Sequence, residues 1–289
     1  MNIICDKTGF VKCFFELDNP ASVRYDYSMM THNHWVKETL AGRDIALLGF
    51  ADLSEIDLDA RRGFPYGVSI AMALTVLPST SEEASIAYYD EYRRVSAQLK
   101  EASAFLTEQI QERGYNALSL WRLDLQDGEF RTPLPFKTLA TRAGLGWIGK
   151  SAALITKEYG NAIRLGGVLT DMPLEAGTPV NESLCGSCDE CVKHCPGQAI
   201  QGNLWDVRTD RDSLLDAHAC KRAVIERGKA LGKTEGTCGI CIAVCPWTRR
   251  PAQPPRRCLP PYGRVGYAEP LHGGELGLRC KRHLEYTQL

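Results

Sequence analysis

The stretch Cys185–Pro196, CGSCDECVKHCP, decides how this chain is organised. It spaces four cysteines as Cys-x2-Cys-x2-Cys-x3-Cys-Pro, and a shorter copy, CGICIAVCP, follows at Cys238–Pro246. In such runs three closely spaced thiolates ligate one cubane cluster, and the cysteine before proline ligates the other. Cys220, upstream of the second copy, supplies the ligand that this copy lacks.

Eight cysteines therefore divide into two predicted ligand sets for two [4Fe–4S] clusters. The first set is Cys185, Cys188, Cys191 and Cys245. The second set is Cys195, Cys220, Cys238 and Cys241. The alternative is a pair of zinc sites, since CxxC pairs also bind zinc. However, four ligands crowded into the first run would leave the other four unpaired, which favours clusters. Two neighbouring clusters predict an electron relay. The remaining cysteines, Cys5, Cys13, Cys258 and Cys280, are interpreted as ordinary thiols.

The composition is that of an ordinary globular protein. The chain has 289 residues, 44% hydrophobic and 24% charged, with a net charge of −1, so the protein as a whole is not a polyanion binder. The N-terminus has no basic region followed by an apolar stretch, and we find no run of 18 apolar residues, so we expect a cytoplasmic protein without membrane contact. Twelve cysteines in a reducing compartment favour metal binding over disulfides.

The cysteine distribution also predicts the domains. We expect a cofactor and substrate domain at residues 1–178, a two-cluster domain at 179–250 and a C-terminal tail at 251–289, with a joint at Glu175–Pro179. In the first domain, residues 82–113 repeat apolar side chains at spacings of three and four, which predicts a long helix. Strands are predicted at 44–50, 67–76 and 116–120, and a hairpin is predicted from 151–156 and 162–170. This mixture predicts an α+β or α/β fold.

A glycine loop precedes the cysteines. Gly144–Ser151, GLGWIGKS, matches both GxGxxG and GxxxxGKS, the patterns of nucleotide-binding loops. A phosphate loop follows a buried strand, whereas residues 136–143 have a helical, amphipathic pattern. Too few residues separate Lys150 from Cys185 for a nucleotide domain. We interpret the glycines as allowing the backbone to approach a bulky flat ligand or to pack tightly.

The longer segment Arg142–Lys150, RAGLGWIGK, closely resembles the signature of epoxyqueuosine reductases. The resemblance extends over roughly residues 43–248 and includes Gly49–Asp52, Gly63–Ile70, Tyr92–Val95, Cys185–Ile200 and Cys238–Trp247. It implies a reductive-dehalogenase-like, corrinoid-binding domain followed by a bacterial-ferredoxin-like module with two [4Fe–4S] clusters. It also implies an oxidoreductase whose clusters pass electrons to cobalamin, which reduces the substrate. In the namesake enzymes, the substrate is epoxyqueuosine on tRNA.

The resemblance implies site residues and partners as well. The implied cofactor-binding residues are Arg142, Gly144, Gly146, Trp147, Gly149 and Lys150. The implied partners are an external electron donor of the ferredoxin or flavodoxin type and a small-molecule or tRNA-borne substrate. Alignment on Pro133 and Arg142 puts Phe130 where the family has a catalytic acid. Tyr66 and Glu129 are therefore the candidate catalytic proton donors, although Tyr66 also has the pattern of a packed turn tyrosine.

The end of the chain departs from the family too. The long C-terminal helical extension of many members is replaced by an arginine- and proline-rich segment, Arg249–Arg257, and a glycine-rich tail. This indicates a short paralogue, whose substrate need not be epoxyqueuosine. Two other functions stay open: an electron-transfer protein that reduces a protein partner without a corrinoid, and a cluster-bearing ATPase that uses the glycine loop.

Overall fold

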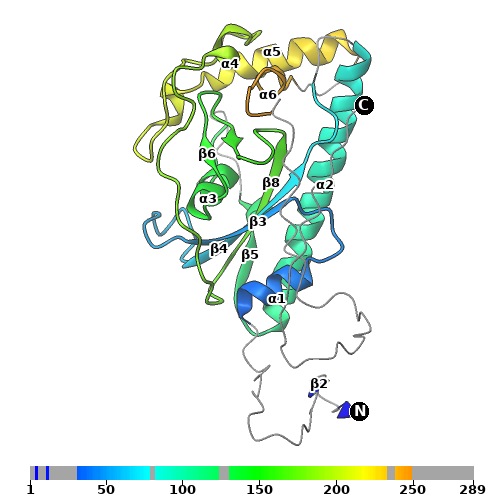
Figure 1. Ribbon diagram of the computed structural model, residues 1–289, viewed down its shortest axis with the longest axis vertical. Coiled ribbons are helices and arrows are strands. Elements are labelled where there is room, and N and C mark those ends of the chain that lie inside the picture. Colours follow the sequence, from blue (N-terminus) through cyan, green and yellow to red (C-terminus); the bar gives the residue numbers. More distant parts are fainter. Residues whose placement is uncertain are drawn as a thin grey trace, which may run out of the picture. The chain divides into compact units, whose positions relative to one another are not determined.

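The computed structural model describes residues 4–5, 11–12, 31–78, 82–123, 130–232 and 238–248 (Figure 1). For residues 4–5, 11–12 and 82–84 it describes the backbone alone. Residues Met1–Ala252 form one compact unit, which contains all of these ranges. The division at residue 178 stays a prediction, and the predicted tail at 251–289 lies outside the described residues.

An antiparallel sheet forms the centre of the unit. Its strand order is β3-β4-β8-β5, and each neighbouring pair is antiparallel. The strands are β3 (Leu47–Asp52), β4 (Tyr66–Ala73), β8 (Ile163–Thr170) and β5 (Ala117–Ser119). Strands are therefore confirmed near 44–50, 67–76, 116–120 and 162–170. Their antiparallel pairing, with helices on the faces of the sheet, makes the fold α+β.

The predicted hairpin between residues 151–156 and 162–170 is wrong. The short strand β7 (Leu154–Ile155) pairs with β6 (Trp147–Ile148), and β8 pairs with β4 and β5. Most of β8 is buried, so it takes a central place in the main sheet, where both of its faces are covered. The chain from the glycine loop consequently folds back on itself as a small separate sheet.

Two helices cover opposite faces of the main sheet. The long predicted helix is confirmed as α2 (Glu82–Glu112), and α3 (Phe136–Arg142) is the shorter one. A Cβ on Gly166 would lie 2.8 Å from Ser103 Oγ of α2, and a Cβ on Gly167 would lie 2.5 Å from Leu139 Cδ2 of α3. Because neighbouring residues of a strand face opposite sides, the two contacts place α2 and α3 on the two faces.

Apolar side chains explain the position of α2. Val95, Leu99, Leu106 and Ile110 are at most 1% exposed and belong to the same packed core as Val68 of β4. Figure 1 shows α2 running alongside β8. The remaining elements are two short paired strands, β1 (Ile4–Cys5) and β2 (Val11–Lys12), the helix α1 (His32–Thr39) and the 3-10 turn η2 (Leu120–Arg122).

The cysteine-rich part consists of short helices and loops. Its elements are α4 (Glu190–Lys193), the 3-10 turn η3 (Arg211–Ser213), α5 (Ala217–Ala230) and α6 (Ile240–Ala243). The segment that leads into it, predicted as a joint, is hydrogen-bonded to the rest of the unit. The amide of Gly177 donates to Phe50 O at 2.8 Å, and the amide of Val180 donates to Thr141 O at 2.9 Å. Among the described helices, none is long and apolar enough to cross a membrane.

Candidate iron–sulfur site and its surroundings

The structure brings the eight motif cysteines together in two groups. All eight are free thiols. The Cys191 thiol interacts electrostatically with Cys185, Cys188 and Cys245. The Cys241 thiol interacts with Cys195, Cys220 and Cys238. These groups match the two predicted sets of four. Cys241 also interacts with Cys191, so the groups adjoin each other. Their role as cluster ligands stays a prediction, and the arrangement is the one that prediction requires.

The two motifs turn in the same way. Gly186 follows the first cysteine of the first motif, and Gly239 follows the first cysteine of the second motif. Both have left-handed backbones, with φ of +56° and +66°. Glycine adopts this conformation without the penalty that a side chain would incur. The chain therefore reverses between the first and second cysteines, and the short helices α4 and α6 carry Cys191 and Cys241.

Burial favours the protonated form of these thiols. Burial and, to a lesser extent, the neighbouring thiols raise the pKa of Cys191 to about 11 and that of Cys241 to about 12. Burial also raises the pKa of Cys220, Cys238 and Cys245. Thiolates are the form that binds metal, so cations are needed to charge this site at neutral pH. Two groups of four mostly half-buried thiols have the chemistry of a metal-bearing site.

The arrangement within each group differs from that of a site for a single metal ion such as zinc. Among the described residues, no three His, Cys, Asp or Glu side chains converge on a position for a single metal ion. A tetrahedral zinc would hold its sulfur ligands about 2.3 Å from one centre. A cubane takes each cysteine on a different iron, so its cysteine sulfur atoms stay farther apart. The observed arrangement favours clusters.

The glycine loop packs tightly against its own chain. A Cβ on Gly144 would lie 2.6 Å from Thr178 O, and a Cβ on Gly146 would collide with Ile155 O. A Cβ on Gly149 would lie 3.3 Å from Cys185 Sγ, which places the loop directly against the first cysteine group. Of the two interpretations of these glycines, the geometry supports tight packing. The loop follows the helix α3, whereas a phosphate loop follows a strand.

Three further residues of the signature have distinct positions. Arg142 is buried, and its Nη2 donates to Val180 O at 2.9 Å and to Asn181 Oδ1. Lys150 is buried and lies close enough to Asp189, inside the first motif, to interact with it electrostatically. Trp147 is 1% exposed and shares a packed cluster with Cys185 and Cys245. The signature thus joins the sheet domain to the first cysteine group.

Of the two candidate proton donors, the structure describes Tyr66 alone. Tyr66 is half-buried at the first position of β4 and packs against the main core, so it lies in a strand and not in a turn. Glu129 lies outside the described residues. Phe130 is 45% exposed, with φ of +51°, and its ring makes an edge contact with His218 at 5.3 Å between centroids. The structure tests none of these residues as catalysts.

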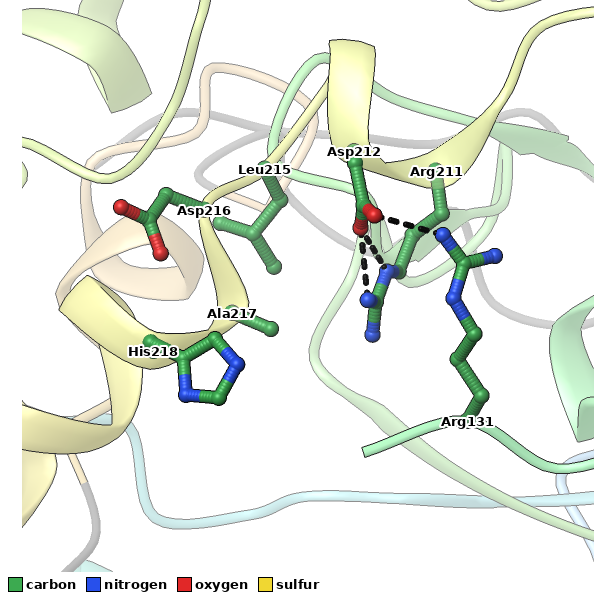
Figure 2. A pocket seen from close by; sticks show the side chains of 7 residues that line it. All are labelled: Arg131, Arg211, Asp212, Leu215, Asp216, Ala217 and His218. Atoms are coloured by element: carbon green, nitrogen blue, oxygen red, sulfur yellow. Dashed lines mark hydrogen bonds and ion pairs between the residues drawn. The ribbon is translucent and has the colours of Figure 1, made fainter. Parts of the chain in front are cut away.

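A cavity that the sequence did not predict lies beside Phe130. It measures about 590 Å³ and is lined by Arg131, Arg211, Asp212, Leu215, Asp216, Ala217 and His218 (Figure 2). The Asp212 carboxylate lies between two guanidinium groups, 2.6 Å from Nη2 of Arg131 and 2.6 Å from Nη2 of Arg211. Arg211 Nη1 also donates to Phe130 O at 3.1 Å. These contacts connect the segment at 130 to η3, which precedes α5, the helix that carries Cys220.

The cationic side chain of Lys137 lies close enough to Arg211 of the cavity to interact with it electrostatically. Lys137 of α3 donates from Nζ to Ala152 O at 2.8 Å. Burial and, to a lesser extent, the positive charge of Arg211 lower the pKa of Lys137 to about 8. Within the described residues, no carboxylate forms an ion pair with Lys137.

Known proteins resemble both parts of this arrangement. Residues 184–248 match the 4Fe-4S double cluster binding domain. An epoxyqueuosine reductase from Synechocystis sp. is 35% identical over 149 residues, which cover 48% of this chain and 50% of the relative. One from Synechococcus sp. is 35% identical over 165 residues, which cover 56% of this chain and 47% of the relative. The predicted resemblance to epoxyqueuosine reductases is confirmed.

Solved structures agree on the fold. A crystal structure of epoxyqueuosine reductase with an epoxyqueuosine-modified tRNA-Tyr stem loop matches with a TM-score of 0.52 and 20% identity, over 75% of this chain and 65% of that chain. A catabolic reductive dehalogenase matches with a TM-score of 0.51 and 18% identity, over 71% of this chain and 30% of that chain. The reductive-dehalogenase-like fold with a double-cluster domain is therefore confirmed. The chain spans about half the length of the curated relatives that it matches.

Proposed function

We propose that this chain is an iron–sulfur oxidoreductase of the epoxyqueuosine reductase type. In this proposal, electrons enter from an external ferredoxin or flavodoxin, pass through two [4Fe–4S] clusters and reach a corrinoid that reduces an organic substrate in the cytoplasm. The observation that carries the proposal is the contact between the signature loop and the first cysteine group. A Cβ placed on Gly149 of this loop would lie 3.3 Å from Cys185 Sγ.

The residues present fit the two clusters. Four thiols in each group supply the four ligands that a cubane requires. The clusters, when bound, supply one-electron chemistry. The protein holds the thiols in place through the left-handed turns at Gly186 and Gly239, and it excludes water through the apolar packing of Trp147, Trp205 and Cys245. Cys191 and Cys241 lie where the groups adjoin, so they mark the route between them.

The proposed corrinoid is supported by other observations than the clusters are. The relatives are named epoxyqueuosine reductases, and one reductive dehalogenase of similar fold is described with a mechanism for B12-dependent dehalogenation. Of the six signature residues, Gly144 and Gly146 pack against their own chain, and Arg142 holds the segment at 180–181. Lys150 has no hydrogen-bond partner among the described residues, and we propose that its ammonium group holds a corrinoid amide.

The substrate is proposed from the cavity. A relative has been solved with a tRNA stem loop, so a tRNA-borne substrate is one candidate, and a small molecule is the other. The cavity of about 590 Å³ beside Phe130 is the space we assign to the reacting part of the substrate. Because Phe130 stands where the family has an acid, a different group, such as Tyr66 or Glu129, must supply any proton.

A spectroscopic titration tests the corrinoid. The anaerobically reconstituted protein is titrated with cob(II)alamin and followed by EPR and absorption. We expect the cob(II)alamin spectrum to change, and we expect Lys150→Ala to weaken this change, whereas Lys157→Ala, at an exposed position of the following turn, leaves it intact. An unchanged cob(II)alamin spectrum with the wild-type protein would exclude the corrinoid.

An electron-transfer protein without a corrinoid is the second candidate. The closed packing of Gly144 and Gly146 and the phenylalanine at position 130 favour it. It predicts full iron content, no spectral change with cob(II)alamin, and oxidation of the reduced clusters by a protein partner that forms a stable complex. The same titration therefore separates the two candidates.

A further inference from the structure

Trp147, within the signature loop, packs against the first cysteine group. It belongs to β6, which pairs with β7, and its side chain is 1% exposed. The packed cluster around it contains Cys185 and Cys245, two of the four thiols of the first group. Its ring makes an edge contact with Trp247, two residues after Cys245, at 4.8 Å between centroids.

The indole N–H of Trp147 is buried without a hydrogen-bond acceptor among the described residues. An indole nitrogen can only donate, and a buried Trp usually finds a partner for it. Such an orphaned donor costs free energy unless something accepts from it. No oxygen or thiol sulfur of the described residues accepts from it, whereas Cys185 and Cys245 of the first cysteine group pack in the same cluster as the ring.

We propose that the Trp147 indole N–H donates a hydrogen bond to a sulfur atom of the cluster held by Cys185, Cys188, Cys191 and Cys245. This inference rests on the cluster-binding part of the proposed function and does not require the corrinoid. Hydrogen bonds to cluster sulfurs tune the reduction potential. Because a reduced cluster carries one more negative charge, the donor stabilises the reduced form and raises the potential.

The site is built to hold this ring in one orientation. Ile155 pairs with Trp147 across the small sheet, and the Trp247 ring lies at 76° to the Trp147 ring. Gly149, two residues on, carries no side chain, so the loop can lie close to Cys185. A donor fixed in this way loses little conformational freedom when it binds a sulfur. Trp147 is thus a positioning and tuning residue that acts through the cluster.

The test compares Trp147→Phe with a matched control in anaerobically purified protein. Phenylalanine removes the N–H and keeps an aromatic ring. Trp121→Phe removes another buried indole N–H that also lacks an acceptor among the described residues, but its ring packs on Phe136, in the sheet domain. Iron content is measured first, and redox titration followed by EPR then gives the potential of each cluster.

We expect Trp147→Phe to keep about eight irons per chain and to lower the reduction equilibrium constant of one cluster about fivefold, the effect of one hydrogen bond. That fold-change equals about 40 mV, at 59 mV for each tenfold change. The second cluster should not change, and Trp121→Phe should leave both unchanged. An exchangeable proton coupled to the reduced cluster in the wild type, seen by ENDOR in H₂O and D₂O, should vanish in Trp147→Phe.

A second variant protects the test against misfolding. Benzothienylalanine at position 147 keeps the shape of the indole and replaces the N–H by sulfur, so it should reproduce the shift. Unchanged potentials and an unchanged ENDOR spectrum with eight irons retained would overturn the inference, and would place the N–H against the Trp247 ring instead. A wild-type protein without iron would overturn the proposed function itself.

Discussion

At the scale of single residues, the two cysteine motifs share a device that spacing alone does not reveal. Gly186 and Gly239 occupy the same place in the two motifs and both have left-handed backbones. The spacing of the cysteines predicted the two ligand sets, because three thiols within a few residues are forced together by the covalent chain. Cys220 was predictable as well, since a second cubane would otherwise lack one ligand.

The thiols give the first residue-scale prediction. Cys241→Ala removes one ligand of the second group, so the iron content should fall from about eight to about four per chain. Cys258→Ala, outside both motifs, should retain about eight. Iron is counted by colorimetric assay after anaerobic purification. Full iron content in Cys241→Ala would remove this residue from the ligand set.

The packing of the glycine loop gives the second residue-scale prediction. A Cβ at position 146 would collide with the carbonyl oxygen of Ile155, which is backbone and cannot move aside easily. Gly146→Ala should therefore lower the free energy of unfolding by about 3 kcal/mol. Gly42→Ala has open space and φ of +80°, so it should lower it by about 1 kcal/mol. Anaerobic denaturant unfolding measures both, and equal losses would contradict the packing role.

At the scale of elements, sequence patterns predicted the helices and strands that are determined by interactions close in the sequence. The period of apolar residues predicted α2 because one face of that helix packs on the sheet. The hairpin at 151–170 was mispredicted because β7 has two residues and pairs with β6, inside the glycine signature. The cavity was not predictable, because Arg131 and Asp212 are 81 residues apart and meet through tertiary packing.

Helix α3 supports a pH prediction through Lys137. Burial lowers the pKa of Lys137 to about 8 from 10.5, so the unfolded chain holds this proton between about pH 8 and 10.5 and the folded chain does not. The lysine therefore costs stability below pH 8, and the cost disappears as the pH rises to 10.5. The full difference is about 3 kcal/mol.

The comparison with Lys137→Met isolates this effect, because other titrating groups are common to both proteins. The stability of the wild type relative to Lys137→Met should rise between pH 8 and 10.5 in anaerobic denaturant unfolding. A relative stability that stays flat or falls over this range would contradict the buried position of the ammonium group.

The start of β8 is tied to the second motif by Asn161. Its side chain is 2% exposed, accepts from Thr248 Oγ1 at 2.7 Å and donates to Cys241 O at 3.4 Å. Asn161→Ala should cost about 1–3 kcal/mol, because it leaves these groups unpaired. Release of iron to a chelator should become faster, whereas Asn203→Ala, whose bond to Ser213 O is exposed, should leave the rate unchanged. Equal rates for Asn161→Ala and the wild type would contradict the link.

At the scale of the whole molecule, the parts are joined by tertiary contacts. The segment at 177–181 is hydrogen-bonded to Phe50, Thr141 and Arg142, and the signature loop packs on the first cysteine group. This geometry connects the relay to the sheet domain through fixed backbone. We infer from it that eight cysteines hold two cubane clusters in this chain.

The most direct test is a count of metals and spins in anaerobically purified wild-type protein. The account predicts about eight irons and eight acid-labile sulfides per chain, with broad absorption near 400 nm that bleaches on reduction and EPR signals from two clusters. About two zinc ions per chain, without iron or labile sulfide, would contradict it.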